Sequence, residues 1–94
     1  MSNKNSFIAS KKLVSEREKY SKALGKRIRA LREAQNISLK GFEASENSID
    51  RHALSRIETG QITPSAFTLY KICKAINISL ADLFRNFEDD LKKS

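Results

Sequence analysis

Apolar residues recur at helical spacing along most of this 94-residue chain, and that periodicity restricts its fold more than any other feature. Near the start of the chain, steps of four, four and three residues place on one helical face Tyr20, Leu24, Ile28 and Leu31. No segment alternates apolar and polar residues as a half-buried strand does. The single proline and the absence of tryptophan also favour helices over a β-sandwich or barrel. The sequence therefore predicts an all-α protein.

Capping and turn residues divide this pattern into five predicted helices. The first begins near Ser15, where Ser15 and Glu18 have the spacing of a capping box, and ends near Gln35. The others are predicted at 39–45 after Ser38, at 51–59 after Asp50, from Thr63 or Ser65 to 75, and at 80–91 after Ser79. Gly60 stands where a helix ends in the left-handed conformation, and residues 46–48 have turn composition. Besides the first helix, the predicted core comprises Leu39, Phe42, Leu54, Ile57, Phe67, Leu69, Ile72, Ile76, Leu80 and Leu83.

The length of the chain suits one domain. We expect a compact five-helix domain at residues 21–91 and a polar tail at 92–94. Residues 1–20 are expected to form an N-terminal extension that is flexible or partly helical.

Positive charge is concentrated in the first four-fifths of the chain. The net charge is +7, and residues 22–78 carry ten Lys and Arg against five acidic residues. Residues 1–21 carry five against two, whereas residues 79–94 carry three against four. An anionic partner such as nucleic acid would therefore be attracted by the first two segments and slightly repelled by the last.

The residue types present do not assemble a catalytic or metal site. Cys73 is the only cysteine and His52 the only histidine, which excludes an internal disulfide and a cysteine-based metal cluster. No apolar run approaches the roughly 18–20 residues of a membrane span, and no secretory signal is recognisable. We expect a cytoplasmic protein that is not an enzyme and that uses no metal, cofactor or membrane.

Several spaced motifs resemble those of the lambda-repressor-like, Cro-type helix-turn-helix family, also called the XRE family. They stand in the family's order at Leu24–Leu31, Ser38–Phe42, Leu54–Gly60, Pro64, Thr68–Ile72 and Ser79–Phe84. The segment Leu54–Gly60 reads Leu-Ser-Arg-Ile-Glu-Thr-Gly, which is the most specific of them. The resemblance implies a compact five-helix lambda-repressor-like domain that binds double-stranded DNA.

A helix that reads the major groove needs long polar side chains on one face and apolar side chains on the other. The segment after Asp50 has this division, because Leu54 and Ile57 share one face. By resemblance to the family, the predicted base-reading residues are Arg51, His52 and Arg56, with Ser55 a weaker candidate. Each of them could instead be an ordinary surface residue. Glu58 is predicted to make an internal polar contact rather than to act in catalysis.

Contacts with the phosphate backbone position such a protein on DNA and supply most of its non-specific affinity. Candidates at the second helix and in the loop after Gly60 are Ser38, Lys40, Gln61, Thr63 and Ser65. Lys26 and Arg29 are further candidates on the first helix.

The second helix departs from the family pattern. Glu43 follows Phe42 where a small residue is usual, and Ala44 comes one position later. In this family the turn after the second helix usually contains a glycine. If the second helix and this turn are shifted by one residue here, Ala44 would make the close contact between helices and Ser48 would stand at the position of that glycine.

The last predicted helix raises the question of a partner. Its apolar face continues beyond Leu83 through Phe84, Phe87 and Leu91. These residues are expected to form a two-fold dimer interface, although they could instead pack within the chain on the apolar residues of the extension, which are Phe7, Ile8, Leu13 and Val14.

The predicted function is that of a sequence-specific transcriptional regulator that binds a palindromic operator as a homodimer. Its recognition helices would lie about one DNA turn apart, roughly 34–36 Å. The alternative is a protein-interaction module, such as an antitoxin-like or anti-repressor-like adaptor, that retains the fold.

Overall fold

The structure is a computed structural model that describes residues 3–45 and 49–93. Along these residues lie six helices: α1 (Asn3–Ala34), α2 (Leu39–Ala44), α3 (Arg51–Glu58), α4 (Ala66–Ala75), α5 (Leu80–Phe84) and α6 (Phe87–Lys93). The described part of the chain contains no strand. The predicted all-α class is therefore confirmed.

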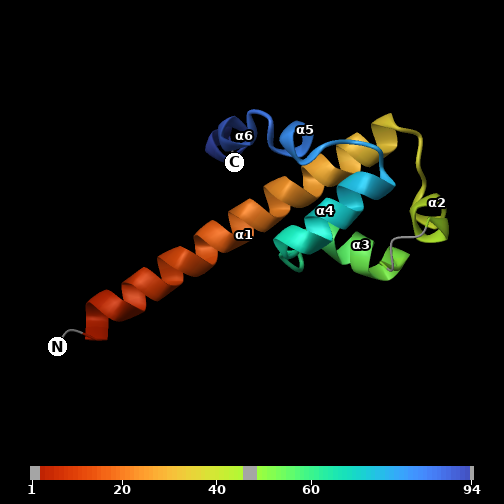
Figure 1. Ribbon diagram of the computed structural model, residues 1–94. Coiled ribbons are helices and arrows are strands. Elements are labelled where there is room, and N and C mark those ends of the chain that lie inside the picture. The colour runs from red at the N-terminus through yellow and green to blue at the C-terminus, as the bar shows by residue number, and fades with distance from the viewer. Residues whose placement is uncertain (1–2, 46–48, 94) are drawn as a thin grey trace.

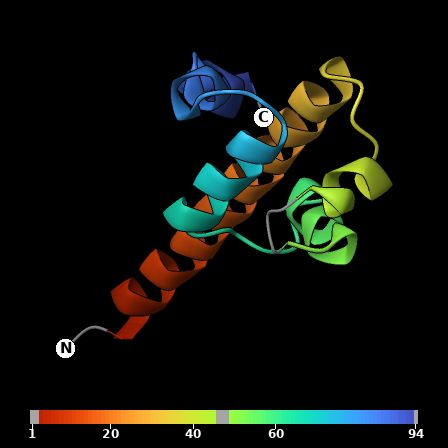
Figure 2. The same ribbon diagram turned by 45° about the vertical axis from the view of Figure 1, so that its right-hand side comes forward.

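The first helix is much longer than predicted. It begins at Asn3 rather than near Ser15 and contains 32 residues, which corresponds to about 48 Å. Its second half is covered by the other helices, whereas its first half projects beyond them (Figures 1 and 2). The molecule consequently measures 52 × 25 × 18 Å. Residues 3–20 of the predicted extension are helical and continuous with the first helix of the domain.

Four helices begin at the capping residues that the sequence predicted. The side chains of Ser38, Asp50, Ser65 and Ser79 each accept a hydrogen bond from the backbone N–H three residues later. Each bond satisfies one of the N–H groups that a helix start leaves without an intrahelical partner. These local interactions fix the starts of α2, α3, α4 and α5.

The core lies between the second half of α1 and the five shorter helices. Its buried apolar side chains are Leu24, Ile28, Phe42, Leu54, Ile57, Leu69, Ile72, Cys73, Ile76, Leu83 and Phe87. The prediction that Phe67 is buried is wrong, because 68% of this residue is exposed. Leu69 and Ile72 form the inner face of α4, and Phe67 lies on the opposite side of the same helix. Leu80, also predicted in the core, is 39% exposed at the start of α5.

The predicted last helix is in fact two helices. α5 ends at Phe84 and α6 begins at Phe87, with Asn86 at a positive φ of 55° between them. The resulting change of direction turns the ring of Phe87 toward α1. There it meets the ring of Tyr20 edge-on, with 5.5 Å between the ring centroids.

Phe87 is only 5% exposed, so its predicted place in a dimer interface is wrong: the chain's own core buries it. Phe84 and Leu91 are half-buried against that core. Lys92 and Lys93, predicted as part of the tail, belong to α6.

The predicted turn at Glu46, Asn47 and Ser48 lies outside the described residues, as does Ser94. Among the helices that the structure describes, none combines the length and the apolar composition needed to cross a membrane.

Candidate nucleic-acid interface

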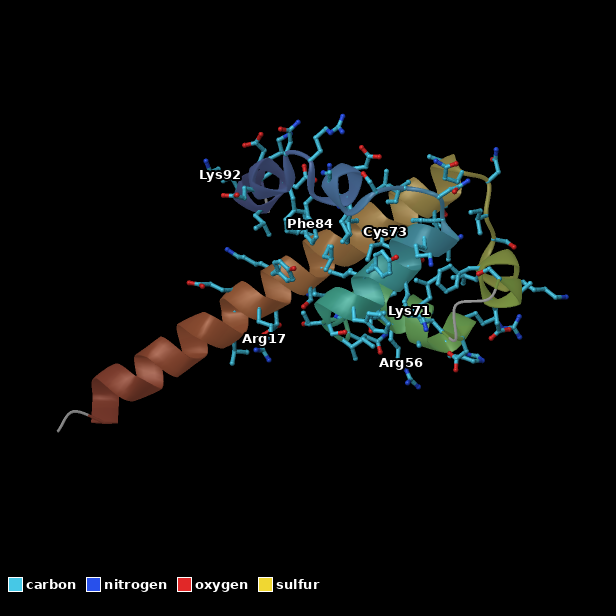
Figure 3. All side chains as sticks on the ribbon, viewed as in Figure 1. Arg17, Arg56, Lys71, Cys73, Phe84 and Lys92 are labelled. Carbon is cyan, nitrogen blue, oxygen red and sulfur yellow. The ribbon has the colours of Figure 1, made fainter. Side chains whose placement is uncertain are left out.

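α3 presents one apolar face to the core and one polar face to solvent. Asp50 caps the helix by accepting a hydrogen bond from the Ala53 N–H at 2.7 Å. On the inner face, Leu54 is completely buried and Ile57 is 3% exposed. On the outer face, Arg56 projects away from α1 (Figure 3). The apolar face of α3 is thus fixed in the core while its polar face is exposed to solvent, as entry of a helix into a major groove requires.

A buried ion pair fixes the end of α3 on α1. Nε and Nη2 of Arg32 donate to the two carboxylate oxygens of Glu58 at 2.7 and 3.0 Å. Nη1 donates to the carbonyl of Ile37, just before α2, at 2.6 Å. The hydrogen bond to Glu58 raises the pKa of Arg32, so its guanidinium group remains charged although it is buried. The predicted internal polar contact of Glu58 is therefore confirmed, and its partner is Arg32.

Two glycines, one in α1 and one just after α3, allow the end of α3 and the loop that follows it to approach α1 closely. A Cβ atom at Gly25 would lie only 2.3 Å from the carbonyl oxygen of Ile57. Gly60 ends α3 with a φ of 79°, as predicted, and a Cβ atom there would lie 2.7 Å from Cγ of Lys22. The loop after α3 therefore lies directly against Lys22, an exposed cation that the sequence analysis did not single out. A glycine inside a helical pattern, as at Gly25, was the available signal for this close approach.

The predicted base-reading residues share the outer surface of α3. Arg51, His52 and Arg56 are exposed, and Ser55 is half-buried. Nε of Arg51 lies 3.9 Å from a carboxylate oxygen of Glu43, so that cation is partly neutralised. Arg56 forms no ion pair with any residue that the structure describes. Of the two guanidinium groups, that of Arg56 is consequently the more available to a base.

The residues predicted to contact phosphate on α2 and in the loop after α3 differ in whether their side chains are already hydrogen-bonded within the chain. Lys40 and Gln61 are exposed, one on α2 and the other in the loop after α3. Ser38, Thr63 and Ser65 already use their hydroxyls within the chain. The hydroxyls of Ser38 and Ser65 cap helices, and that of Thr63 is hydrogen-bonded to Ser21. Among these candidates only Lys40 offers a positive charge to a phosphate.

Lys26 and Arg29 on α1 are less well placed to contact phosphates beside α3. Lys26 lines an open groove of about 530 Å³ between α1 and α6, together with Arg27 and Asp90. Arg29 forms an exposed ion pair with Glu33 at 3.2 Å. On α1, Lys22 lies directly beside Gly60, whereas Lys26 lies toward α6.

Glu43 explains the departure of the second helix from the family pattern. One of its carboxylate oxygens accepts a hydrogen bond from the backbone N–H of Arg51 at 3.0 Å, so Glu43 helps to hold the start of α3. Ala44 is exposed, and the expected close contact of Ala44 with a neighbouring helix is therefore wrong. Phe42 fills the interior at this point and is completely buried. Ser48 lies outside the described residues.

Comparisons with known proteins agree with this geometry. The sequence model of the helix-turn-helix family matches residues 28–83, which is more than half of the chain and includes α2, α3 and α4. The crystal structure of the clp gene regulator ClgR from C. glutamicum shares the fold, with a TM-score of 0.69 and 24% identity over 77% of this chain and 91% of that chain. No curated protein matches the sequence. Because the family match spans the helices that carry and support the open surface of α3, the chain belongs to the lambda-repressor-like, Cro-type helix-turn-helix family of DNA-binding proteins.

Proposed function

We propose that this protein is a transcriptional regulator that reads a specific sequence of double-stranded DNA with α3 in the major groove. One observation carries the proposal: α3 is anchored by Leu54 and Ile57 while Arg51, His52 and Arg56 stand exposed on its other face. An enzymatic function has no comparable support.

In this proposal, Arg56 and Arg51 read bases. A guanidinium group can donate two hydrogen bonds to the major-groove edge of guanine, which contributes about 1–3 kcal/mol of discrimination. His52 contributes a further contact near the start of α3, and Ser55 a weaker one. Glu43 sets the position of Arg51 and limits its contribution relative to Arg56.

Phosphate contacts flank α3 on two sides. Lys40 on α2 supplies one, and Lys22 supplies another beside the loop after Gly60. Ser38, Gln61, Thr63 and Ser65 contribute through neutral polar groups, which position the protein without reading sequence. Lys26 and Arg29 stay secondary candidates because they lie toward α6 or pair with Glu33.

The regulator is proposed to act as a homodimer on a palindromic operator. One α3 contacts only a few base pairs, whereas two copies related by a two-fold axis read two half-sites one helical turn apart. Isologous dimers are also the commonest oligomers of small proteins.

Selection of bound oligonucleotides from a random pool tests the proposal. The expected result is a two-fold symmetric sequence, and Arg56→Ala and Arg51→Ala should each weaken binding to it by about 1–3 kcal/mol and relax preference at one position. Lys40→Ala is the matched control, because loss of a phosphate contact should weaken all sequences equally. If the arginine variants also weaken all sequences equally, the assignment of base contacts is wrong.

A protein-interaction module is the second candidate, and the exposed aromatic residues of α4 favour it. Phe67 is 68% and Tyr70 46% exposed, and their ring centroids lie 6.4 Å apart. Such a surface suits contact with another protein. A salt titration on random DNA separates the candidates: a DNA reader should lose affinity steeply as salt increases, whereas an adaptor should bind DNA weakly at every salt concentration.

A further inference from the structure

We infer that the α4 face, which consists of Phe67, Tyr70, Lys71 and Lys74, binds an acidic, apolar helix of a partner protein. The inference goes beyond DNA recognition. It rests on the second candidate function, protein interaction, and names the chemistry of the partner that this surface would take.

The four side chains of the α4 face make up the side of α4 that lies away from the core. With 3.6 residues per turn, positions 67, 70, 71 and 74 fall within about 100° of the helix circumference, and no other residue of α4 shares that arc. The buried residues Leu69, Ile72 and Cys73 lie on the opposite side. A stripe with this spacing is the surface that one helix presents to another helix. α4 contains 10 residues, so a partner helix of about three turns would cover it.

The two rings supply the apolar part of the α4 face. Phe67 and Tyr70 are both exposed, and no described part of the chain covers them. Their centroids lie 6.4 Å apart and their planes are inclined by 31°, so the rings form one continuous aromatic surface. Aromatic side chains are enriched in the buried centres of protein interfaces, which makes these two rings suitable anchors for a partner.

The two lysines make the α4 face positive. Nζ of Lys71 lies 5.7 Å from the centroid of the Phe67 ring, and Nζ of Lys74 lies 5.5 Å from that of Tyr70. Neither lysine pairs with a carboxylate of the residues that the structure describes, and residues 59–81 contain no Asp or Glu. The charge is therefore not compensated nearby. The complementary surface is an apolar one flanked by carboxylates.

Other occupants match the α4 face less well. A second copy that used the same face would bring lysines against lysines, which is unfavourable. The backbone of a DNA duplex would attract the lysines but would give the two rings little apolar surface to cover. In Figure 3, moreover, Arg56 projects from α3 on the side away from α4. The strongest base-reading candidate thus does not belong to this surface.

Titration with a synthetic helical peptide tests the inference. The probe is a peptide of about 18 residues, or five helical turns, with leucine on one side and glutamate flanking that side. Its control peptide has glutamine in place of glutamate. On addition of the acidic peptide, the NMR spectrum of the isotope-labelled native chain should change most at the backbone amides of α4. The glutamine peptide should bind roughly fivefold more weakly, because exposed ion pairs are individually weak.

Variants of the α4 face test both of its components. Phe67→Ala should weaken binding of the acidic peptide about tenfold, since it removes an aromatic anchor. Lys71→Gln combined with Lys74→Gln should weaken it roughly fivefold. Lys92→Gln combined with Lys93→Gln is the matched control, because it removes the same charge from exposed residues of α6 and should leave binding unchanged. Circular dichroism checks that each variant is folded.

Three results would overturn the inference. The first is no saturable binding of the acidic peptide by the native chain up to millimolar concentration. The second is a set of spectral changes that lies outside α4, or an α6 control that weakens binding as much as the α4 lysine variant. The third is tighter binding of a single-stranded oligonucleotide or a random duplex than of the peptide to the α4 face, which would make the lysines phosphate contacts.

Failure of this inference can be told from failure of the proposed functions, because the peptide titration contains no DNA. A chain that binds the peptide at α4 but no specific DNA sequence keeps the inference and loses DNA reading. A chain that behaves as an adaptor in the salt titration but does not bind the peptide keeps protein interaction and loses the inference.

Discussion

Arg32 on α1 and Glu58 at the end of α3 form an ion pair with two hydrogen bonds, and only 6% and 5% of their side chains are exposed. This contact ties the proposed recognition helix to the longest helix of the domain. Since Arg32 also holds the carbonyl of Ile37, one guanidinium group sets the relation of α1, α3 and the segment before α2. The orientation of the surface that would meet DNA depends on this group.

Glu58→Ala should destabilise the protein by roughly 3–5 kcal/mol, because it leaves the charge of Arg32 buried without a partner. Urea unfolding at neutral pH measures this change. Glu33→Ala is the control, since it removes an exposed pair with Arg29 and should cost about 0–1 kcal/mol. Equal effects of the two substitutions would contradict the structural role of the buried pair.

Gly25→Ala should destabilise the domain by about 1–3 kcal/mol, because the added Cβ must displace α3. That atom would lie 2.3 Å from the carbonyl oxygen of Ile57. At Gly41 the nearest atom is the Ser38 hydroxyl oxygen at 3.2 Å, so Gly41→Ala should change stability by less than about 1 kcal/mol. Thermal unfolding of the two variants gives the comparison, and a tolerated alanine at position 25 would show that the helices can separate.

Phe87→Ala and Phe67→Ala should behave very differently although both remove a phenyl ring. Phe87 is 5% exposed and packs on Tyr20, so its loss should cost roughly 3–5 kcal/mol. Phe67 is 68% exposed, and its replacement should change stability by about 0.5 kcal/mol or less. Chemical denaturation at several protein concentrations measures both. A Phe87→Ala chain that keeps its stability would restore this residue as a candidate for an intermolecular contact.

Lys22→Ala should weaken DNA binding without changing the preferred sequence. Loss of one phosphate contact should reduce the slope of log affinity against log salt by about 1. Fluorescence anisotropy over a series of salt concentrations provides this slope. Lys26→Ala is the neighbouring control and should leave it nearly unchanged, because Lys26 lines the groove beside α6. The reverse result would assign the contact to Lys26.

Cys73 should make stability depend on alkaline pH. Burial, and secondarily the charge of Asp82, raises the pKa of its thiol, so the folded chain holds this proton more tightly than the unfolded chain. The contribution of this raised pKa to the free energy of unfolding is fully present below the ordinary thiol pKa. It is lost as the pH rises through the pKa that the thiol has in the folded chain. The difference in unfolding free energy between the native chain and Cys73→Ala should therefore shrink at alkaline pH. A constant difference would mean that the thiol is not protected.

The sequence alone determined the features that depend on neighbouring residues. Ser38, Asp50, Ser65 and Ser79 start helices because each side chain bonds an N–H three residues away, and Gly60 ends α3 through its own backbone conformation. The two faces of α3 likewise follow from helical periodicity, which is why the candidate surface could be predicted before its surroundings were known.

Tertiary structure decided what depends on residues distant along the chain. Phe67 and Phe87 both stand in amphipathic patterns, yet only Phe87 is buried, because the break at Asn86 turns it onto Tyr20. The pairing of Glu58 with Arg32 and the contact of the Gly60 loop with Lys22 also join remote segments. Periodicity shows which faces of a helix are apolar, but burial is a free-energy balance over every surface that packs there, and that balance exists only once the helices have come together.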